Sequence, residues 1–482
     1  MINIQPIIRV IGVLLLILGG LMFFCIPFSF YFDAGDEGPL FWSGLIGVVI
    51  ALPILRFVKS NGSIKKREGY LIVALGWLTM VTYGMLPFLF SGVIPTITDA
   101  LFETVSGMTT TGASILEDIE STPEGILFWR SLTQWIGGMG IIVLTVAIFP
   151  LLGIGGIELF VAEAPGPTSD KLHPRIQETA KRLWFLYVAL TGLLIGILYV
   201  LGMSFYDAFN HALTTMATGG FSTKNTSMAY FNVPAIQYVI VIFMFLAGTN
   251  YTVIYFAFKG EFKKIWQSDE FRAYLFMVIG LGVLVTIGVH SVTNQSFEQS
   301  FRDSIFQIVS ILTTTGFVSA DYTSWSDGLT MTFFILLFIG ACAGSTSGGI
   351  KVIRHLVLFK NSYLEFKRIL HPRAIVPLKL NGQRVRGKII THIIIFLLIY
   401  LILFVIGSII LTILGLDFMT AIGAVATCLG NVGPGIGAVG PVDNFAHLSD
   451  PIKLFLSFYM LLGRLELFTI LVLFTPFFWK TA

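Results

Sequence analysis

Long hydrophobic runs recur along the whole chain and are separated by short polar stretches. A helix of about 20 apolar residues crosses a hydrocarbon core of about 30 Å. Ten runs approach or exceed that length, and we expect each to span a membrane, at residues 8–29, 40–57, 70–90, 126–150, 183–202, 233–258, 273–290, 328–356, 389–414 and 453–478. The pattern predicts an all-α integral membrane protein.

Shorter apolar segments lie between some of these spans. Each is about 12 residues long, which is too short to cross the bilayer and is typical of re-entrant helices. They cover residues 99–110, 206–217, 303–314 and 419–430.

Composition agrees with a membrane location. Of 482 residues, 55% are hydrophobic and only 12% are charged, which is unlike soluble domains. The net charge of +3 gives no reason to expect nucleic acid as a partner. Cys25, Cys342 and Cys428 lie in apolar stretches without metal-ligand spacing, so the sequence supports neither a disulfide framework nor a zinc site. The first run lacks the A-x-A-like cleavage site of a signal peptide, and we expect it to be a retained span.

Basic residues, lysine and arginine, are concentrated in every second loop of the chain. They concentrate in loops 56–69, 151–182, 259–272 and 351–388, whereas the alternate loops hold only Lys224 and Arg302. Because basic loops stay in the cytoplasm, we expect both termini there and all the short segments entering from the outer face.

The short segments resemble one another in sequence. They read "DALFETVSGMTTTGAS", "DAFNHALTTMATGGFS", "DSIFQIVSILTTTGFVS" and "TAIGAVATCLGNVGPG". In each, a glycine falls 13 residues after the opening residue, at Gly112, Gly220, Gly316 and Gly433. We infer four pseudo-symmetric repeats of span, pore helix, filter loop and span around one central ion pore.

Two extra transmembrane helices precede these repeats. We place the two N-terminal helices at 1–69 and the repeats at 70–150, 183–258, 273–370 and 389–479, with a broken second span in the third repeat.

The predicted pore helices would help to attract a cation. Asp99, Asp207, Asp303 and Thr420 are good N-cap residues, so we expect the helices to start there and to direct their negative C-terminal ends inward. Four such ends attract a monovalent ion by about 5 to 6 kcal/mol at roughly 6 Å and an effective dielectric of about 20. That attraction does not replace a hydration shell.

Backbone carbonyls of the loops would replace that shell. Non-helical backbone at membrane depth is tolerated where it is buried in protein or lines a cavity, and glycine permits the required angles. We expect a dehydrated alkali cation to bind four filter triplets: Thr110, Thr111 and Gly112; Thr218, Gly219 and Gly220; Thr314, Thr315 and Gly316; and Asn431, Val432 and Gly433.

Together these motifs resemble a known family. Fourfold repeats with T-x-G-like loops are similar to the potassium-uptake superfamily that includes TrkH, TrkG and KtrB and the plant and fungal Trk/HKT transporters. The two extra spans and the stretches "GNVGPG", "GSTSGGIK" and "LGRLELF" point to the TrkH/TrkG branch. The resemblance implies potassium as the substrate, no organic cofactor on this chain, and a homodimer in membrane lipid. It also implies a bacterial inner membrane location and a cytosolic nucleotide-binding regulatory ring of the TrkA type.

The predicted span 328–356 is interrupted by small and polar residues at 340–351. Gly344 and Gly349 have the spacing of a phosphate-binding loop, but Ile350 follows where that motif needs lysine. Close helix packing by small residues is one interpretation. The favoured interpretation is a flexible intramembrane gate beneath the filter, formed by Gly344, Ser345, Thr346, Ser347, Gly348, Gly349 and Lys351.

Arg464 lies near the middle of the last predicted span, where an arginine costs about 2.5 to 3.5 kcal/mol and should face the protein interior. It forms either a structural ion pair or a fixed positive charge that limits conduction. The family resemblance favours the second role, so we assign Arg464 to the gate. A further basic set is either a solvated cytoplasmic segment or a docking surface for a regulator: Lys351, Arg354, Lys360, Lys367 and Arg368.

Two rival functions differ from a gated potassium pore. A symporter on the same scaffold would couple potassium to protons or sodium, although no intramembrane acidic relay stands out. A membrane-embedded enzyme needs convergent acid, base or metal ligands at one membrane face, and the sequence offers no such cluster. We therefore expect a transport protein and not an enzyme.

Overall fold

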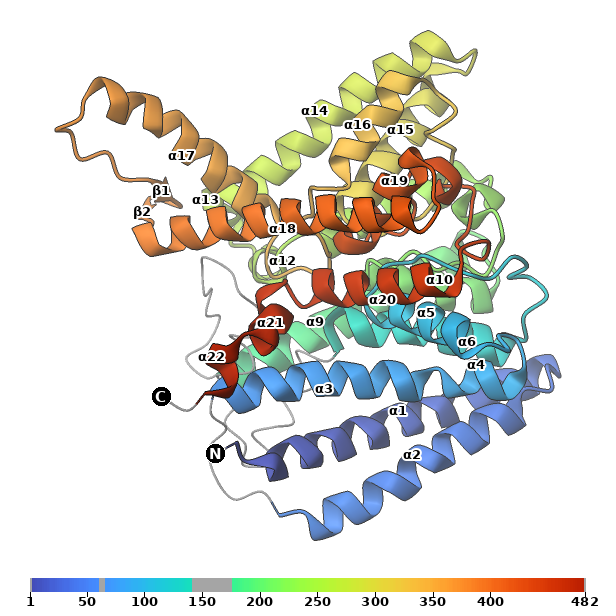
Figure 1. Ribbon diagram of the computed structural model, residues 1–482. Helices are drawn as coiled ribbons and strands as arrows, with labels where there is room; N and C mark the ends of the chain where they lie inside the picture. The colour runs from blue at the N-terminus through green and yellow to red at the C-terminus, as the bar shows by residue number, and fades with distance from the viewer. Residues whose placement is uncertain (1, 60–65, 141–175, 481–482) are drawn as a thin grey trace.

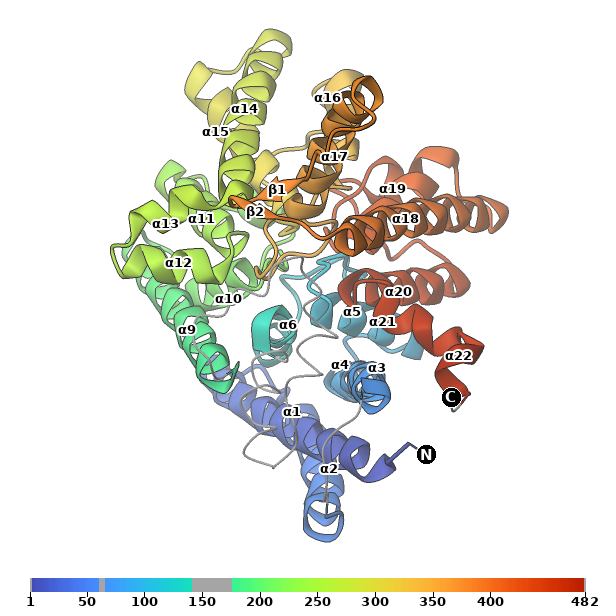
Figure 2. The same cartoon turned by 90° about the vertical axis from the view of Figure 1, so that its left-hand side faces the viewer.

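The computed structural model describes residues 2–59, 66–140 and 176–480, and helices dominate it (Figure 1). The end of the predicted span 126–150 and most of the basic loop 151–182 lie outside the described residues. Figure 2 shows groups of helices arranged around a centre, in chain order.

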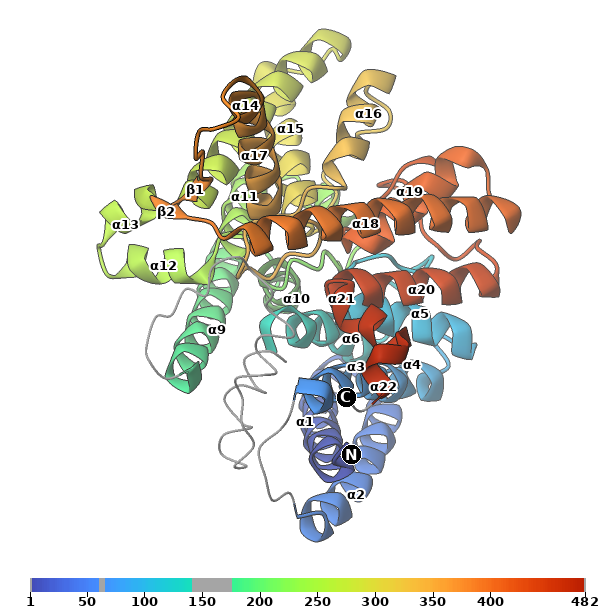
Figure 3. The same cartoon turned by 60° about the vertical axis from the view of Figure 1, so that its left-hand side comes forward.

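The chain begins with an antiparallel helix pair. Helices α1 (Ile4–Phe32) and α2 (Glu37–Phe57) pack along a seam of small residues, where a Cβ on Gly44 would lie 3.0 Å from the carbonyl oxygen of Gly19. Small residues let membrane helices approach this closely. The pair lies against the first repeat, outside the ring of helices (Figure 3).

Most predicted spans are continuous helices. Six segments are long and apolar enough to cross a membrane within the described ranges. They are α1, α2, the combined α3 (Lys66–Gly84) and α4 (Leu86–Ser91), α9 (Ile176–Val200), α14 (Asp269–Val292) and α18 (Gly387–Ile413). The second span of the first repeat starts as α6 (Glu124–Trp135) and a π-helical turn, η1 (Ile136–Gly140).

Two further predicted spans, 233–258 and 453–478, are each made of two helices that meet at a sharp bend, which the sequence did not predict. Helix α11 (Pro234–Ala247) meets α12 (Tyr251–Phe258) at 110°, and α20 (Asp450–Arg464) meets the following helical segment at 107°. The first break is stabilised because Asn250 caps α12 through the Thr252 N–H, at 2.8 Å. At the second break, Glu466 and Leu467 adopt left-handed φ angles of 55° and 56°, which end the helix.

The predicted break in the third repeat is present. Helix α16 (Asp327–Leu336) ends before residues 340–351, which form a non-helical loop, and α17 (Val352–Leu370) starts after it. A short antiparallel hairpin of β1 (Lys379–Leu380) and β2 (Gln383–Arg384) follows. The remaining short elements are η2 (Ser227–Tyr230), α13 (Phe262–Gln267), η3 (Gly437–Val439), α21 (Phe468–Leu471), η4 (Val472–Phe474) and α22 (Pro476–Trp479).

All the predicted re-entrant segments are helices that are too short to span. They are α5 (Ile97–Met108), α10 (Phe205–Met216), α15 (Phe297–Leu312) and α19 (Phe418–Gly430). The predicted N-caps were wrong, because the capping oxygens come from residues further toward the N-terminus: Thr96, Ser204, Ser296 and Asp417.

The physical reason is that a capping side chain accepts the N–H three residues later. The hydroxyls of Thr96 and Ser204 accept from the N–H groups of Asp99 and Asp207 and donate to the carboxylates of the same aspartates. Asp417 likewise accepts from Thr420. Asp303 lies well inside α15, which starts at Phe297.

Both ends of the described chain contact the start of α3. The Asn3 N–H donates to Glu68 at 2.8 Å, and Arg67 donates to the Lys480 carbonyl at 2.7 Å. The start of α1 and the short helix α22 therefore lie at the same end of the molecule (Figure 1).

Candidate functional site

Each pore helix ends in the same left-handed turn. The first residue of every filter triplet has a positive φ, at 54° in Thr110, 53° in Thr218, 56° in Thr314 and 52° in Asn431. This conformation costs roughly 1–2 kcal/mol for a residue with a side chain and is a true outlier for β-branched threonine. Strain of this kind gathers at functional sites.

The same hydrogen bond closes all of these turns. The second residue of the triplet donates its N–H to a carbonyl five residues earlier, as in a Schellman motif. The donor–acceptor distances are 2.8 Å for Thr111 to Ser106, 2.9 Å for Gly219 to Thr214, 2.8 Å for Thr315 to Ser310 and 3.0 Å for Val432 to Thr427. The four segments are therefore structural copies, as their sequences predicted.

The third residue of each triplet is a glycine that lies against the next loop. A Cβ added to Gly112 would lie 2.3 Å from the carbonyl oxygen of Gly219, and one on Gly220 would lie 2.0 Å from that of Thr315. The corresponding distances are 2.1 Å from Gly316 to Val432 and 2.7 Å from Gly433 to Thr111. These contacts run from repeat 1 to 2, 3, 4 and back to 1, so the triplets form a closed ring.

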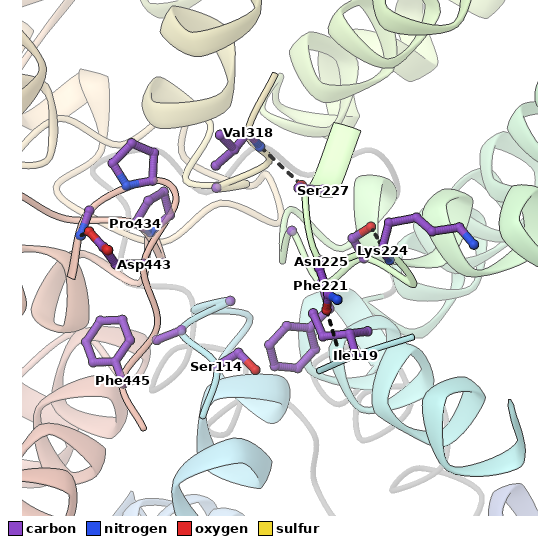
Figure 4. A pocket seen from close by; sticks show the side chains of 18 of the residues that line it. Ser114, Ile119, Phe221, Lys224, Asn225, Ser227, Val318, Pro434, Asp443 and Phe445 are labelled. Carbon is purple, nitrogen blue, oxygen red and sulfur yellow. Dashed lines mark hydrogen bonds between the residues drawn. The ribbon is translucent and has the colours of Figure 1, made fainter. Parts of the chain in front are cut away.

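This ring has the chemistry of a cation site. The glycines also have positive φ angles between 77° and 105°. In each triplet a left-handed residue is followed by one without a positive φ and then by the glycine, so the backbone of the triplet is not helical. Rings of backbone carbonyls replace the water around a cation in ion filters. All four glycines also line one hollow of about 90 Å³, together with Phe221, Pro434 and Asp443 (Figure 4).

Hydrogen bonds between repeats surround this hollow. Each joins the segment after one glycine to the neighbouring repeat, so the ring is fixed on this side as well. The bonds run from Arg130 to the Ser222 carbonyl at 3.0 Å, from Ala229 to Val318 at 3.0 Å, from the Tyr322 hydroxyl to Gly435 at 2.6 Å and from Phe445 to Ser114 at 2.9 Å.

Polar side chains on the pore helices support the loops from behind, and our sequence reasoning missed them. Glu103 accepts from the Ser114 hydroxyl at 3.0 Å, and His211 bonds to the Ser222 hydroxyl at 2.9 Å. Gln307 donates to the Ser319 hydroxyl at 3.3 Å. All three lie four residues after the aspartate that opens each aligned segment, and the fourth repeat has Ala424 there. The alignment of the repeats could therefore have identified these side chains, because a polar residue recurs at this position in three of the four segments.

Loop 340–351 contacts the filter triplets directly. The Gly348 N–H donates to the Thr314 hydroxyl at 2.6 Å, and a Cβ on Gly348 would lie 2.7 Å from the Cβ of Asn431. Thr346 donates to the carbonyl of Met216, the last residue of α10, at 3.0 Å. Small residues are needed here for close approach, but the loop they form is not helical. The structure therefore places the predicted gate residues against the second, third and fourth repeats.

Arg464 connects this loop to the first repeat. Its guanidinium donates to the Thr346 carbonyl at 2.9 Å and to the carbonyls of Gly138, at 2.9 Å, and Gly137. Lys351 donates to the hydroxyl of Ser347 at 3.1 Å and to its carbonyl. Both cations thus contact loop 340–351, and the contacts described here for Arg464 are with backbone carbonyls.

The basic set after the loop serves partly structural roles. Lys351 and Arg354 are buried, and Arg354 forms an ion pair with Glu466. Lys360 pairs with Asp269 at 2.6 Å, and Arg368 pairs with Glu365 at 2.7 Å.

We expect Thr314→Val to raise ion flux by loosening loop 340–351. Valine has nearly the same shape but removes the acceptor for Gly348, and such a hydrogen bond is worth about 1 kcal/mol, or roughly a fivefold shift in loop position. Tracer uptake into liposomes measures the effect. Thr218→Val is the matched control, since the Thr218 hydroxyl bonds only locally to Ala217 in the described structure. Equal flux in the two variants would show that the contact does not restrain the loop.

Comparison with known proteins agrees with this architecture. A family model described as a cation transport protein, TrkH, matches residues 39–481. The Trk system potassium uptake protein TrkH of Salmonella typhimurium is 40% identical over 99% of each chain. TrkG of Escherichia coli is 36% identical over 88% of this chain and 87% of its own.

A solved structure extends the likeness to the fold. The crystal structure of the potassium transporter TrkH from Vibrio parahaemolyticus superposes with a TM-score of 0.89 at 36% identity, covering 99% of this chain and 100% of that one. Fold and comparisons together define an α-helical membrane transport protein with four pseudo-symmetric repeats, and not an enzyme. The chain belongs to the TrkH family of cation transport proteins.

Proposed function

We propose that this protein takes up potassium across the plasma membrane through the four filter triplets. The closed ring of glycine-to-carbonyl contacts supports the proposal, because each contact brings a backbone oxygen of one repeat against the glycine of its neighbour. The named activity of the relatives, potassium uptake, supports potassium as the ion.

Loop 340–351 is the proposed gate. The position of the loop supports this proposal. The loop contacts Thr314 and Asn431 of the filter triplets, and Arg464 donates to its Thr346 carbonyl. An arginine here acts as a fixed positive charge close to the ion path. Displacement of the loop opens the pathway below the filter.

A cytosolic nucleotide-binding ring of the TrkA type is the proposed regulator, and a homodimer is the proposed assembly. The basic end of α17 and the hairpin of β1 and β2 offer exposed arginine and lysine on the side that the loop charges place in the cytoplasm. We place both termini on that side, in a bacterial inner membrane. Their shared contact with α3 supports a common side for the two ends.

Isotope uptake into liposomes tests the transport function. We expect potassium and rubidium to compete for one pathway, and sodium and lithium to compete weakly. Uptake that persists without a second ion gradient indicates a gated channel, whereas dependence on a proton or sodium gradient indicates the symporter. Absence of cation flux from a folded, reconstituted protein would contradict the proposal.

A further inference from the structure

Two side chains of the first repeat contact the filter loop of the second. Arg130 and Gln134 lie one turn apart on α6, and both are buried. Residues four apart share one face of a helix. That face meets Gly219, Gly220 and Phe221.

Gln134 bonds to the second filter triplet on both sides of Gly220. Its amide NH₂ donates to the Gly219 carbonyl at 2.5 Å, and its amide oxygen accepts from the Phe221 N–H at 3.0 Å. The Gly219 carbonyl is also the oxygen that faces Gly112 in the ring. One amide thus fixes a filter carbonyl and the residue that follows the filter glycine.

The same amide accounts for the glycine at the middle position of the second triplet. A Cβ on Gly219 would lie 2.3 to 2.7 Å from the amide atoms of Gln134. Gly219 is absent from the residues with positive φ, so its backbone would accept a side chain. The equivalent positions hold Thr111, Thr315 and Val432. Gln134 therefore fills the space that a side chain of the triplet itself fills in the other repeats.

Arg130 fixes the next residues of the same loop. It donates to the Ser222 carbonyl at 3.0 Å and lies over the Phe221 ring, 3.5 Å from its centroid. Its charge is balanced by Glu103 at 2.7 Å, which itself accepts from the Ile115 N–H at 2.9 Å in the first loop. A buried ion pair with all these bonds fixes geometry and does not leave a free charge at the hollow.

We propose that Arg130 and Gln134 are positioning residues for ion selection, acting on the second filter triplet from a different repeat. The proposal rests on the proposed potassium uptake. Because the amide donates to one ring carbonyl, it sets both the place and the field strength of that oxygen. Selection between cations depends on these two properties of the coordinating carbonyls.

The test is the ratio of potassium to sodium uptake in liposomes, measured on purified, reconstituted full-length protein. Gln134→Met keeps the length of the side chain and removes both hydrogen bonds. Gln134→Glu is nearly isosteric and accepts from Phe221, but the carboxylate cannot donate to Gly219. We expect both variants to lower the ratio by about tenfold, because the buried Gly219 carbonyl loses the Gln134 donor and such a loss costs more than the net worth of one hydrogen bond.

Arg130→Met should lower the ratio as well, and Arg130→Lys should restore part of it by keeping the charge beside Glu103. Ser131→Ala is the matched control, since Ser131 is buried on the same helix and, among the described residues, donates only to Leu127 of that helix, at 3.3 Å. We expect the ratio of this variant to match that of the unaltered protein.

A compensating pair separates positioning from general damage. Gly219→Thr collides with the Gln134 amide and should lower the ratio, and adding Gln134→Ala frees the space. We expect the double variant to have a higher ratio than either single variant. An unchanged ratio in Gln134→Glu, or a double variant no better than Gly219→Thr, would overturn the inference. Lack of flux in the unaltered protein would instead overturn the proposed function.

Discussion

Gly220→Ala is expected to reduce potassium uptake to the level of protein-free liposomes. The new methyl group would lie 2.0 Å from the carbonyl oxygen of Thr315, which real Cβ atoms do not approach, so the carbonyl or the loop must move. The φ angle of 77° adds strain for any side chain. Because Thr315 belongs to the third filter triplet, the displacement damages two adjacent loops of the ring.

Gly260→Ala is the matched control for this substitution. Gly260 has nearly the same φ, 73°, but a Cβ there meets nothing within 4 Å. It therefore carries the same backbone strain, about 1–2 kcal/mol, without a collision. Normal uptake in Gly260→Ala and loss in Gly220→Ala would locate the effect in the ring. Normal uptake in both would contradict the assignment of the filter triplets.

Arg464→Ala is expected to increase potassium uptake by roughly tenfold. Two unit charges about 10 Å apart at an effective dielectric of about 20 repel by roughly 1.7 kcal/mol, so removal of the arginine should favour the cation. The substitution also releases the Thr346 carbonyl, and with it one restraint on loop 340–351. Initial rates of tracer uptake at low potassium concentration measure the change.

Two conservative variants separate these contributions. Arg464→Gln removes the charge and keeps a donor for a backbone carbonyl, whereas Arg464→Lys keeps the charge but cannot reach the carbonyls of Gly137, Gly138 and Thr346 together. If charge dominates, glutamine raises uptake and lysine does not. A large loss of uptake in a normally folded Arg464→Ala protein would instead assign the arginine a structural role.

Fourfold periodicity made much of the architecture predictable from the sequence. The spacing of Gly112, Gly220, Gly316 and Gly433 aligned the pore helices, and the structure gives those helices the same C-terminal turn and the same hydrogen bond. This worked because the turn is local: a left-handed residue followed two positions later by glycine is encoded within a few residues. Membrane spans were predictable for the same kind of reason, since length and hydrophobicity are local properties.

The break at 340–351 was predictable from its small and polar residues, but the breaks after α11 and α20 were not. Residues 248–250 interrupt a hydrophobic span because distant groups accept their freed backbone bonds: the Gly248 carbonyl accepts from Cys342, and Tyr251 donates to Gly344. A hydropathy profile contains no information about such distant hydrogen-bond partners. The helix starts were misplaced for a related reason, since an aspartate favours both the cap and the third residue after it, and only the hydrogen bond distinguishes them.

The sequence also did not identify candidate site residues that belong to one repeat and contact the filter triplet of another. Gln134 and Arg130 belong to the first repeat but contact the second triplet, about 85 residues away along the chain. Nothing in their local pattern distinguishes a buried polar residue that supports a filter from one that joins two helices. The filter triplets themselves stay predictions until ion binding is measured.

One polypeptide supplies every quadrant of this ring, and its quadrants are not identical. In a pore made of four identical subunits, a single codon change alters all four quarters at once. Pores with only one altered quarter therefore do not arise when every subunit carries the change. Here a mutation alters one quarter alone. The preference for one cation over another can therefore change in small independent steps. Successive mutations in single quadrants can lower ion selectivity and raise the rate of ion flux.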